Sequence, residues 1–178
     1  STIKLAVIGE CMVELSTVQN ASEQSNAAQS NNTIKQSFGG DSMNTAIYLK
    51  KLADDAVDVH YVSSMGDDAL SNTLIKQWQG YGINTDSVLI NPVKHAGLYM
   101  IQNDADGERT FQYWRNDSAA KYLVQHSYFE QTVQKLKSFD AVYLSGISLA
   151  ILPEEDCKKL LVHLTQLAKL GVKIIFDS

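Results

Sequence analysis

Hydrophobic and polar positions along this chain of 178 residues follow two different periods. Short apolar runs rich in β-branched residues predict buried strands at residues 3–9, 57–63, 86–90, 140–145 and 172–176. Between them, apolar residues recur every three or four positions, which predicts helices at residues 41–53, 67–81, 127–137 and 153–170. Strands that alternate with helices indicate an α/β fold with a mostly parallel sheet covered by helices on both faces.

Four further strand patterns do not alternate with helices. They lie near residues 12–18, 33–38, 96–102 and 109–115. The last two flank a segment rich in turn-forming residues, so we expect them to form a hairpin. Together the four fit a separate small antiparallel sheet that projects as a lid. The Ser-, Asn- and Gln-rich segment at 21–32 is expected to be an exposed connection.

The composition is that of an ordinary globular protein, with 44% hydrophobic and 20% charged residues. The net charge of −5 and the pI near 5.3 argue against nucleic acid as a partner. No stretch approaches the roughly 20 apolar residues that span a bilayer, so no membrane partner is expected. The apolar segment 3–9 is too short for a signal peptide, which makes a cytoplasmic location the expectation. Cys11 and Cys157 are expected to be reduced, packed thiols.

Metal binding is not expected from this sequence. The four histidines are not spaced as metal ligands. The acidic segment 103–108 lacks the spacing and the terminal Glu of an EF-hand loop.

Two adjacent glycines, Gly39 and Gly40, open the predicted helix at 41–53. Glycines let backbone N–H groups approach a ligand, and a helix N-terminus favours electron-rich groups. Asp41 and Asn44 are three residues apart and face one side of the first turn, where they suit a polyhydroxylated small molecule. The alternative is a simple turn with Asp41 as the N-cap.

The predicted hairpin carries a second set of candidate residues. Tyr113 and Arg115 share one face by the two-residue period, and Tyr99 reaches that face if the register is right. An Arg flanked by Tyr hydroxyls is well suited to a carboxylate. The alternative is an aromatic cross-strand cluster with a surface Arg.

Three segments carry a resemblance to a known family. Gly9-Glu10 ends the first strand, the run Gly39–Ala46 places Asn and Ala at fixed spacing after two glycines, and Gly66-Asp67-Asp68 follows the next core strand. The chain resembles the ribokinase-like (PfkB) sugar kinases. The resemblance implies a three-layer α/β/α fold with a β lid. It also implies that residues 1–178 are the N-terminal part of one ribokinase-like domain whose C-terminal half is absent.

Within that family, the segments 107–116 and 143–152 are most similar to the kinases of 2-dehydro-3-deoxy-D-gluconate. The implied activity is ATP- and Mg²⁺-dependent phosphorylation of the 6-hydroxyl of this sugar acid. The implied substrate-binding residues are Glu10, Gly39, Gly40, Asp41, Ser42, Met43, Asn44, Tyr99, Tyr113, Trp114 and Arg115. Arg115 would bind the acid end of the sugar, and the lid would also form a homodimer contact.

The sequence departs from the family pattern in one respect. The catalytic Asp of the family is expected beyond Ser178, and so are the main contacts to ATP and Mg²⁺. The expectation is therefore that this segment binds the acceptor and is inactive alone. The alternatives are another sugar kinase of the family, a fructokinase or a ribokinase, and a noncatalytic sugar-binding or dimerisation module.

Overall fold

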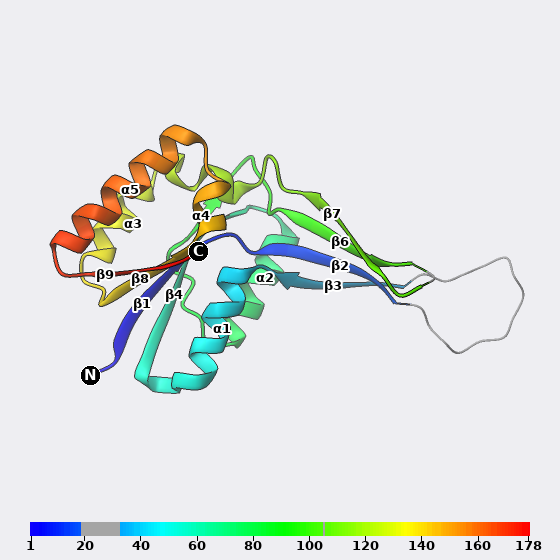
Figure 1. Ribbon diagram of the computed structural model, residues 1–178, viewed down its shortest axis with the longest axis horizontal. Helices are drawn as coiled ribbons and strands as arrows, with labels where there is room; N and C mark the ends of the chain where they lie inside the picture. Colours follow the sequence, from blue (N-terminus) through cyan, green and yellow to red (C-terminus); the bar gives the residue numbers. More distant parts are fainter. Residues whose placement is uncertain (19–32, 105) are drawn as a thin grey trace, which may run out of the picture.

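The computed structural model describes residues 1–18, 33–104 and 106–178, so the polar connection expected at 21–32 lies outside the described residues. The described strands form two sheets, and the smaller sheet projects from one end of the larger one (Figure 1). No helix in these residues is long and apolar enough to cross a membrane.

The larger sheet has five strands in the order β5-β4-β1-β8-β9, and every neighbouring pair is parallel. The strands are β1 (Ile3–Ile8), β4 (Val57–Gly66), β5 (Val88–Asn91), β8 (Ala141–Ser145) and β9 (Lys173–Asp177). The predicted parallel sheet is therefore confirmed.

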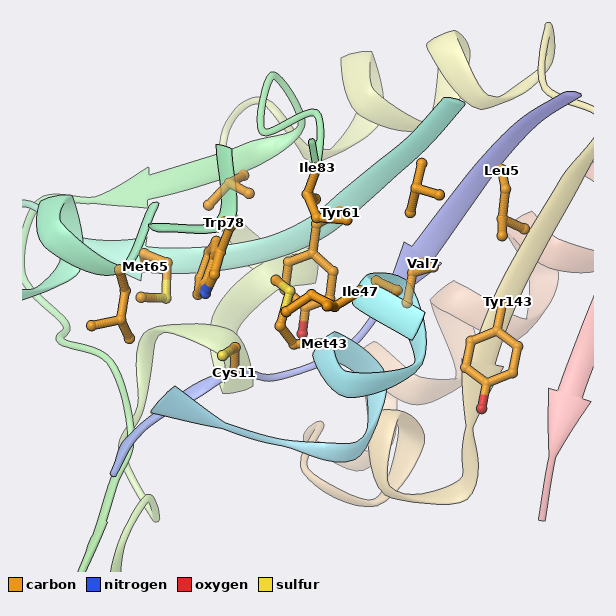
Figure 2. Packing of buried hydrophobic residues seen from close by; sticks show 14 of the residues in the cluster. Leu5, Val7, Cys11, Met43, Ile47, Tyr61, Met65, Trp78, Ile83 and Tyr143 are labelled. Carbon is orange, nitrogen blue, oxygen red and sulfur yellow. The ribbon is translucent and has the colours of Figure 1, made fainter. Parts of the chain in front are cut away.

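Helices cover both faces of this sheet, as expected for three layers (Figure 1). The helices are α1 (Asp41–Ala53), α2 (Ala69–Gly80), α3 (Phe129–Leu136), α4 (Gly146–Ala150) and α5 (Glu154–Lys169), with the 3₁₀ segments η1 (Asp54–Ala56) and η2 (Ala119–Gln125). In β1, Leu5 and Val7 pack with residues of α1 and α2, and Figure 2 shows this cluster. The alternate residues, Ala6 and Ile8, pack with residues of α3 and α5. Successive side chains of a strand point to opposite faces, so one strand serves both cores.

The smaller sheet has the order β3-β2-β6-β7, built from β2 (Met12–Val18), β3 (Thr33–Gly39), β6 (Leu98–Asn103) and β7 (Arg109–Trp114). The predicted strands are all present, and β6 and β7 form the expected hairpin pair. The prediction of a purely antiparallel sheet was wrong, because β2 and β6 pair in parallel. The chain passes from β1 into β2 and from β5 into β6, so it enters both strands from the larger sheet. The two strands therefore run in the same direction.

The remaining differences from the sequence prediction are local. The short elements η2 and α4 were not predicted, and α4 begins with a capping box between Ser145 and Ser148. Leu52, which fits the apolar period of α1, is 82% exposed. A helix in contact with the sheet over its first turns buries only those turns, so the period alone overestimates its buried face.

Candidate functional site

The carboxyl end of β1 meets the start of α1 at a close backbone approach. A Cβ atom at Gly9 would overlap the Ser42 hydroxyl, so glycine at this position lets the first turn of α1 approach β1. Gly40 has a φ of 149°, and a Cβ there would lie 2.6 Å from the carbonyl oxygen of Glu10. This backbone conformation strongly favours glycine.

The first turn of α1 presents two polar side chains to solvent. Gly40 is the N-cap, and its carbonyl oxygen accepts from the Asn44 N–H at 3.0 Å. Asp41 is therefore the first helical residue, not the cap that the simpler interpretation requires. Asp41 and Asn44 are both exposed. Their side chains are free to contact a ligand, in the positive field of the helix N-terminus.

Two predicted site residues on the same turn point into the protein. Met43 is fully buried in the core cluster beside Tyr61 (Figure 2). The Ser42 hydroxyl is also buried and lies 2.7 Å from the Tyr61 hydroxyl. Packing against the sheet occupies both side chains, so we leave Ser42 and Met43 out of the candidate site.

The smaller sheet brings a tyrosine to the glycine turn. Tyr99 pairs with Tyr113 across the hairpin, and their rings stack at 5.8 Å. The Tyr99 hydroxyl donates a hydrogen bond to Glu14 and lies where a Cβ of Gly39 would be. Partial burial and the neighbouring Glu14 carboxylate raise the pKa of Tyr99, which keeps its hydroxyl protonated. Glu14 was not predicted as a site residue, although its pairing with Tyr99 follows once the β2–β6 register is known.

Trp114 does not share the face of Tyr99 and Tyr113. Trp114 pairs with Leu98, and Leu98 packs toward the α1–α2 core. Since faces alternate along a strand, Trp114 projects from the side opposite Tyr113. We therefore separate Trp114 from the tyrosine pair.

Arg115 follows β7 directly and reaches back to the end of β1. Its Nη2 lies 2.6 Å from Glu10 Oε1, in an ion pair whose N–H direction is not aligned for a hydrogen bond. Glu10 Oε2 accepts a hydrogen bond of 2.5 Å from the Ser118 hydroxyl. The Glu10 side chain is 3% exposed and that of Arg115 is 22% exposed. Glu10, predicted to lie near the sugar, is thus buried next to Arg115.

The two sets of candidate residues converge on Glu10. Its carbonyl oxygen limits the space at Gly40, and its carboxylate pairs with Arg115. The start of α1 and the residue after β7 are therefore neighbours, because both contact Glu10. This proximity is what a single small ligand would require.

A cavity of about 530 Å³ adjoins Arg115. Its lining residues are Val93, Lys94, His95, Ala96, Tyr113, Trp114, Arg115, Asn116, Asp117 and Ser118. Asp41, Asn44 and Tyr99 are not among them, so the cavity is lined by the candidate residues at the end of β7 and not by those of α1 or β6.

Each basic side chain of this cavity has a carboxylate neighbour. Lys94 Nζ lies 2.5 Å from Asp117 Oδ2, and His95 Nδ1 lies 3.2 Å from Asp68 Oδ2. Arg115 is paired with Glu10 in the same way. The basic side chains of the cavity are thus all paired, and Arg115 differs because its partner is buried.

The Gly66-Asp67-Asp68 segment supports this cavity. A Cβ at Gly66 would lie 2.9 Å from the carbonyl oxygen of Lys94, so glycine here lets β4 pack under the cavity loop. Asp68 caps α2 by accepting from the Ser71 N–H at 2.8 Å. Partial burial would raise the pKa of Asp68, but the hydrogen bonds from Ser71 and the proximity of His95 lower it overall.

Metal coordination finds no support in the described part of the chain. Among residues 1–18, 33–104 and 106–178, no three His, Cys, Asp or Glu side chains are grouped so that they could hold an ion. Both cysteines are free, and Cys11 is buried while Cys157 is half-buried. Burial raises the pKa of the Cys11 thiol, so this thiol stays protonated.

Comparison with known sequences gives close relatives. The chain is 48% identical over 176 residues to the 2-dehydro-3-deoxygluconokinase of Haemophilus influenzae, covering 98% of this chain and 52% of the relative. It is 42% identical over 179 residues to the enzyme of the same name from Dickeya dadantii, covering 100% of this chain and 54% of the relative. The chain spans about half the length of the curated relatives it matches.

Solved structures share its fold. A PfkB protein from Polaromonas sp. JS666 superimposes with a TM-score of 0.77 at 19% identity, covering 99% of this chain and 55% of the other. A fructokinase with bound ATP from Xylella fastidiosa gives a TM-score of 0.76 at 18% identity, covering 99% and 52%. The profile of the pfkB family carbohydrate kinases matches residues 2–178. The chain therefore belongs to the pfkB family of carbohydrate kinases, with the ribokinase-like α/β fold.

Proposed function

We propose that the kinase containing this chain transfers the γ-phosphoryl group of ATP to the 6-hydroxyl of 2-dehydro-3-deoxy-D-gluconate. Residues 1–178 supply the acceptor-binding part and the lid. Relatives that are 48% and 42% identical carry the name 2-dehydro-3-deoxygluconokinase, which supports this acceptor.

The observation that carries the proposal is the position of Arg115. One edge of its guanidinium contacts the buried Glu10 carboxylate, and the side chain also lines the cavity. A guanidinium has five N–H donors in two directions, so a second edge is available for a carboxylate. The acid end of the sugar suits this edge, whereas a neutral sugar offers it no anion.

The hydroxyl end of the acceptor is assigned to the first turn of α1. Asp41 accepts hydrogen bonds from hydroxyls, Asn44 donates and accepts, and the half-buried Gly40 has no side chain to block a close approach to its backbone. Tyr99 closes this side through its contact with Gly39, and Tyr113 flanks the sugar beside Tyr99. The smaller sheet then acts as a lid that excludes water and protects ATP from hydrolysis.

Mg-ATP and the catalytic base are assigned elsewhere. The described residues hold no group of three or more His, Cys, Asp or Glu side chains that could hold a metal ion. The fructokinase from Xylella fastidiosa binds ATP, and this chain matches 52% of it. We assign the nucleotide site and the catalytic Asp to the part of such kinases that this chain does not match. Residues 1–178 alone are then inactive.

Product analysis with a panel of acceptors tests the proposal. A full-length kinase carrying this sequence is given ATP and either 2-dehydro-3-deoxy-D-gluconate, D-gluconate, D-fructose or D-ribose, and the products are identified by ³¹P NMR. We expect 6-phosphorylation of the keto acid at the highest kcat/KM. A preference for fructose or ribose would support the alternative sugar kinases. Sugar binding in calorimetry without turnover of any acceptor would support a noncatalytic module.

A further inference from the structure

Glu10 occupies an unusual place for an acidic residue. It lies two residues after the end of β1, between the larger sheet and the hairpin of the smaller sheet, and its side chain is 3% exposed. Burial of a carboxylate is costly unless a cation and hydrogen bonds compensate it. The partners of its carboxylate therefore decide what the buried Glu10 does.

Both ends of Glu10 are held. Its backbone carbonyl oxygen accepts from the Ser42 hydroxyl at 3.5 Å and packs against Gly40. Its carboxylate receives the Ser118 hydroxyl at 2.5 Å and the Arg115 guanidinium at 2.6 Å. A glycine at position 97 leaves room for the carboxylate, since a Cβ there would lie 3.0 Å from Glu10 Oε2.

These contacts determine the position of Arg115. An unrestrained Arg side chain samples many rotamers and loses that freedom when it binds a ligand. The buried carboxylate fixes Nη2 beforehand and directs the rest of the guanidinium toward the cavity. Lys94 and His95 lack this restraint, since their partners Asp117 and Asp68 are themselves partly exposed.

We infer that Glu10 is a positioning residue, which holds the Arg115 guanidinium in place for the carboxylate of the acceptor and does not itself contact the sugar. This inference rests on the proposed function. It makes the preference for an acidic over a neutral acceptor depend on Glu10 through Arg115. A negative charge at Glu10 also repels the acceptor carboxylate. Removal of this charge would lower KM for the acid if repulsion dominated, and would raise it if Glu10 acts by positioning Arg115.

The test is a double-mutant cycle of Glu10→Gln and Arg115→Ala in the full-length kinase. Acceptors are 2-dehydro-3-deoxy-D-gluconate and 3-deoxy-D-fructose, in which a primary alcohol replaces the carboxylate. We expect Glu10→Gln to raise KM for the acid about tenfold with little change in kcat, because a displaced Arg115 would lose one charged hydrogen bond to the acceptor carboxylate. KM for the alcohol should stay within about twofold. In the Arg115→Ala background, Glu10→Gln should not raise KM for the acid further, since interacting residues are not additive.

Three outcomes would overturn the inference. These are an equal rise of KM for both acceptors, additive effects in the double mutant, and tighter binding of the acid by Glu10→Gln. Glu10→Asp, which keeps the charge on a shorter side chain, should restore part of the acid preference. Glu130→Gln is the matched control, because Glu130 is an exposed carboxylate paired with His163.

Two further measurements keep the test decisive. If Glu10→Gln does not fold, Ser118→Ala removes the hydrogen bond to Glu10 alone and should raise KM for the acid selectively but less. The Arg115 side-chain NH signals in ¹⁵N NMR should exchange slowly with water in the wild type and rapidly in Glu10→Gln or Ser118→Ala. If the wild type does not phosphorylate the acid, the proposed function fails, while unchanged NH exchange contradicts the role of Glu10 itself.

Discussion

Single residues set the geometry of the glycine turn. Gly40 combines a φ of 149° with a hypothetical Cβ only 2.6 Å from the Glu10 carbonyl oxygen. Any other residue is therefore strained by its backbone and also displaces the Glu10 backbone. The position of the carboxylate that pairs with Arg115 depends on this turn.

Gly40→Ala is expected to lower the free energy of unfolding by about 1–3 kcal/mol, the usual cost of a strained backbone conformation. Urea denaturation followed by circular dichroism measures it. Gly80→Ala is the matched control, because Gly80 lies in α2 with open space around it. This control should be neutral or stabilising by up to about 1 kcal/mol, since Ala favours a helix. An equal effect of both substitutions would remove the special role of Gly40.

At the scale of elements, the N-terminus of α2 ties the Gly66–Asp68 segment to the cavity loop. Asp68 caps the helix and contacts His95. Its pKa is lowered in the folded state, so the folded protein binds fewer protons there than the unfolded chain. This contribution to stability is complete above the ordinary Asp pKa near 4 and is lost as the pH falls through the lower folded value.

Asp68→Ala should cost about 1 kcal/mol of unfolding free energy at pH 7, the typical value of an N-cap. Asp68→Asn retains a good cap, so it should be nearly as stable as the wild type at pH 7 but lose less stability between neutral pH and pH 3. Thermal denaturation across this pH range measures both. Asp67→Asn, at the exposed neighbouring position, is the control and should keep the wild-type acid dependence. The same pH dependence in Asp68→Asn and the wild type would contradict the assignment.

Elements governed by local sequence were the ones that could be predicted. The bounds of α1 agree with the prediction because the glycine pair and the apolar period are local signals. The burial of Met43 could also have been read from that period, since it shares a stripe with Ala46 and Ile47. Met43 was assigned to the site because it lies within the family motif. Its position on the helix instead indicates burial in the core, as the structure shows.

Features that depend on contacts between distant segments could not be predicted. The parallel pairing of β2 with β6 joins strands more than 80 residues apart, and no local signal carries it. The pairing of Glu10 with Arg115 depends on that register. The sequence identified both residues as candidates, but only the fold shows that one is buried against the other.

At the scale of the whole molecule, the smaller sheet offers an exposed aromatic surface. In the described part of the chain β7 is an edge strand, and Phe111 and Tyr113 on it are exposed. Edge strands and exposed aromatic clusters favour association. We propose a homodimer through this sheet, as the family resemblance implies.

Phe111→Lys should shift the kinase from dimer to monomer in sedimentation velocity at micromolar concentration, because it buries a charge in the interface. Tyr128→Lys is the control, since Tyr128 is exposed next to α3, away from the smaller sheet. A dimer that persists in Phe111→Lys, or a wild type that is already monomeric, would contradict the proposed interface.

The central claim is that Arg115 recognises the acid end of a keto-sugar acid. The most direct measurement is the ratio of kcat/KM for 2-dehydro-3-deoxy-D-gluconate to that for 3-deoxy-D-fructose, in the wild type and in Arg115→Ala. A charged hydrogen bond is worth about 1.5–3 kcal/mol, so the ratio should fall by about 10- to 150-fold in Arg115→Ala. An unchanged ratio in a folded variant would contradict the claim and leave Arg115 as a structural partner of Glu10.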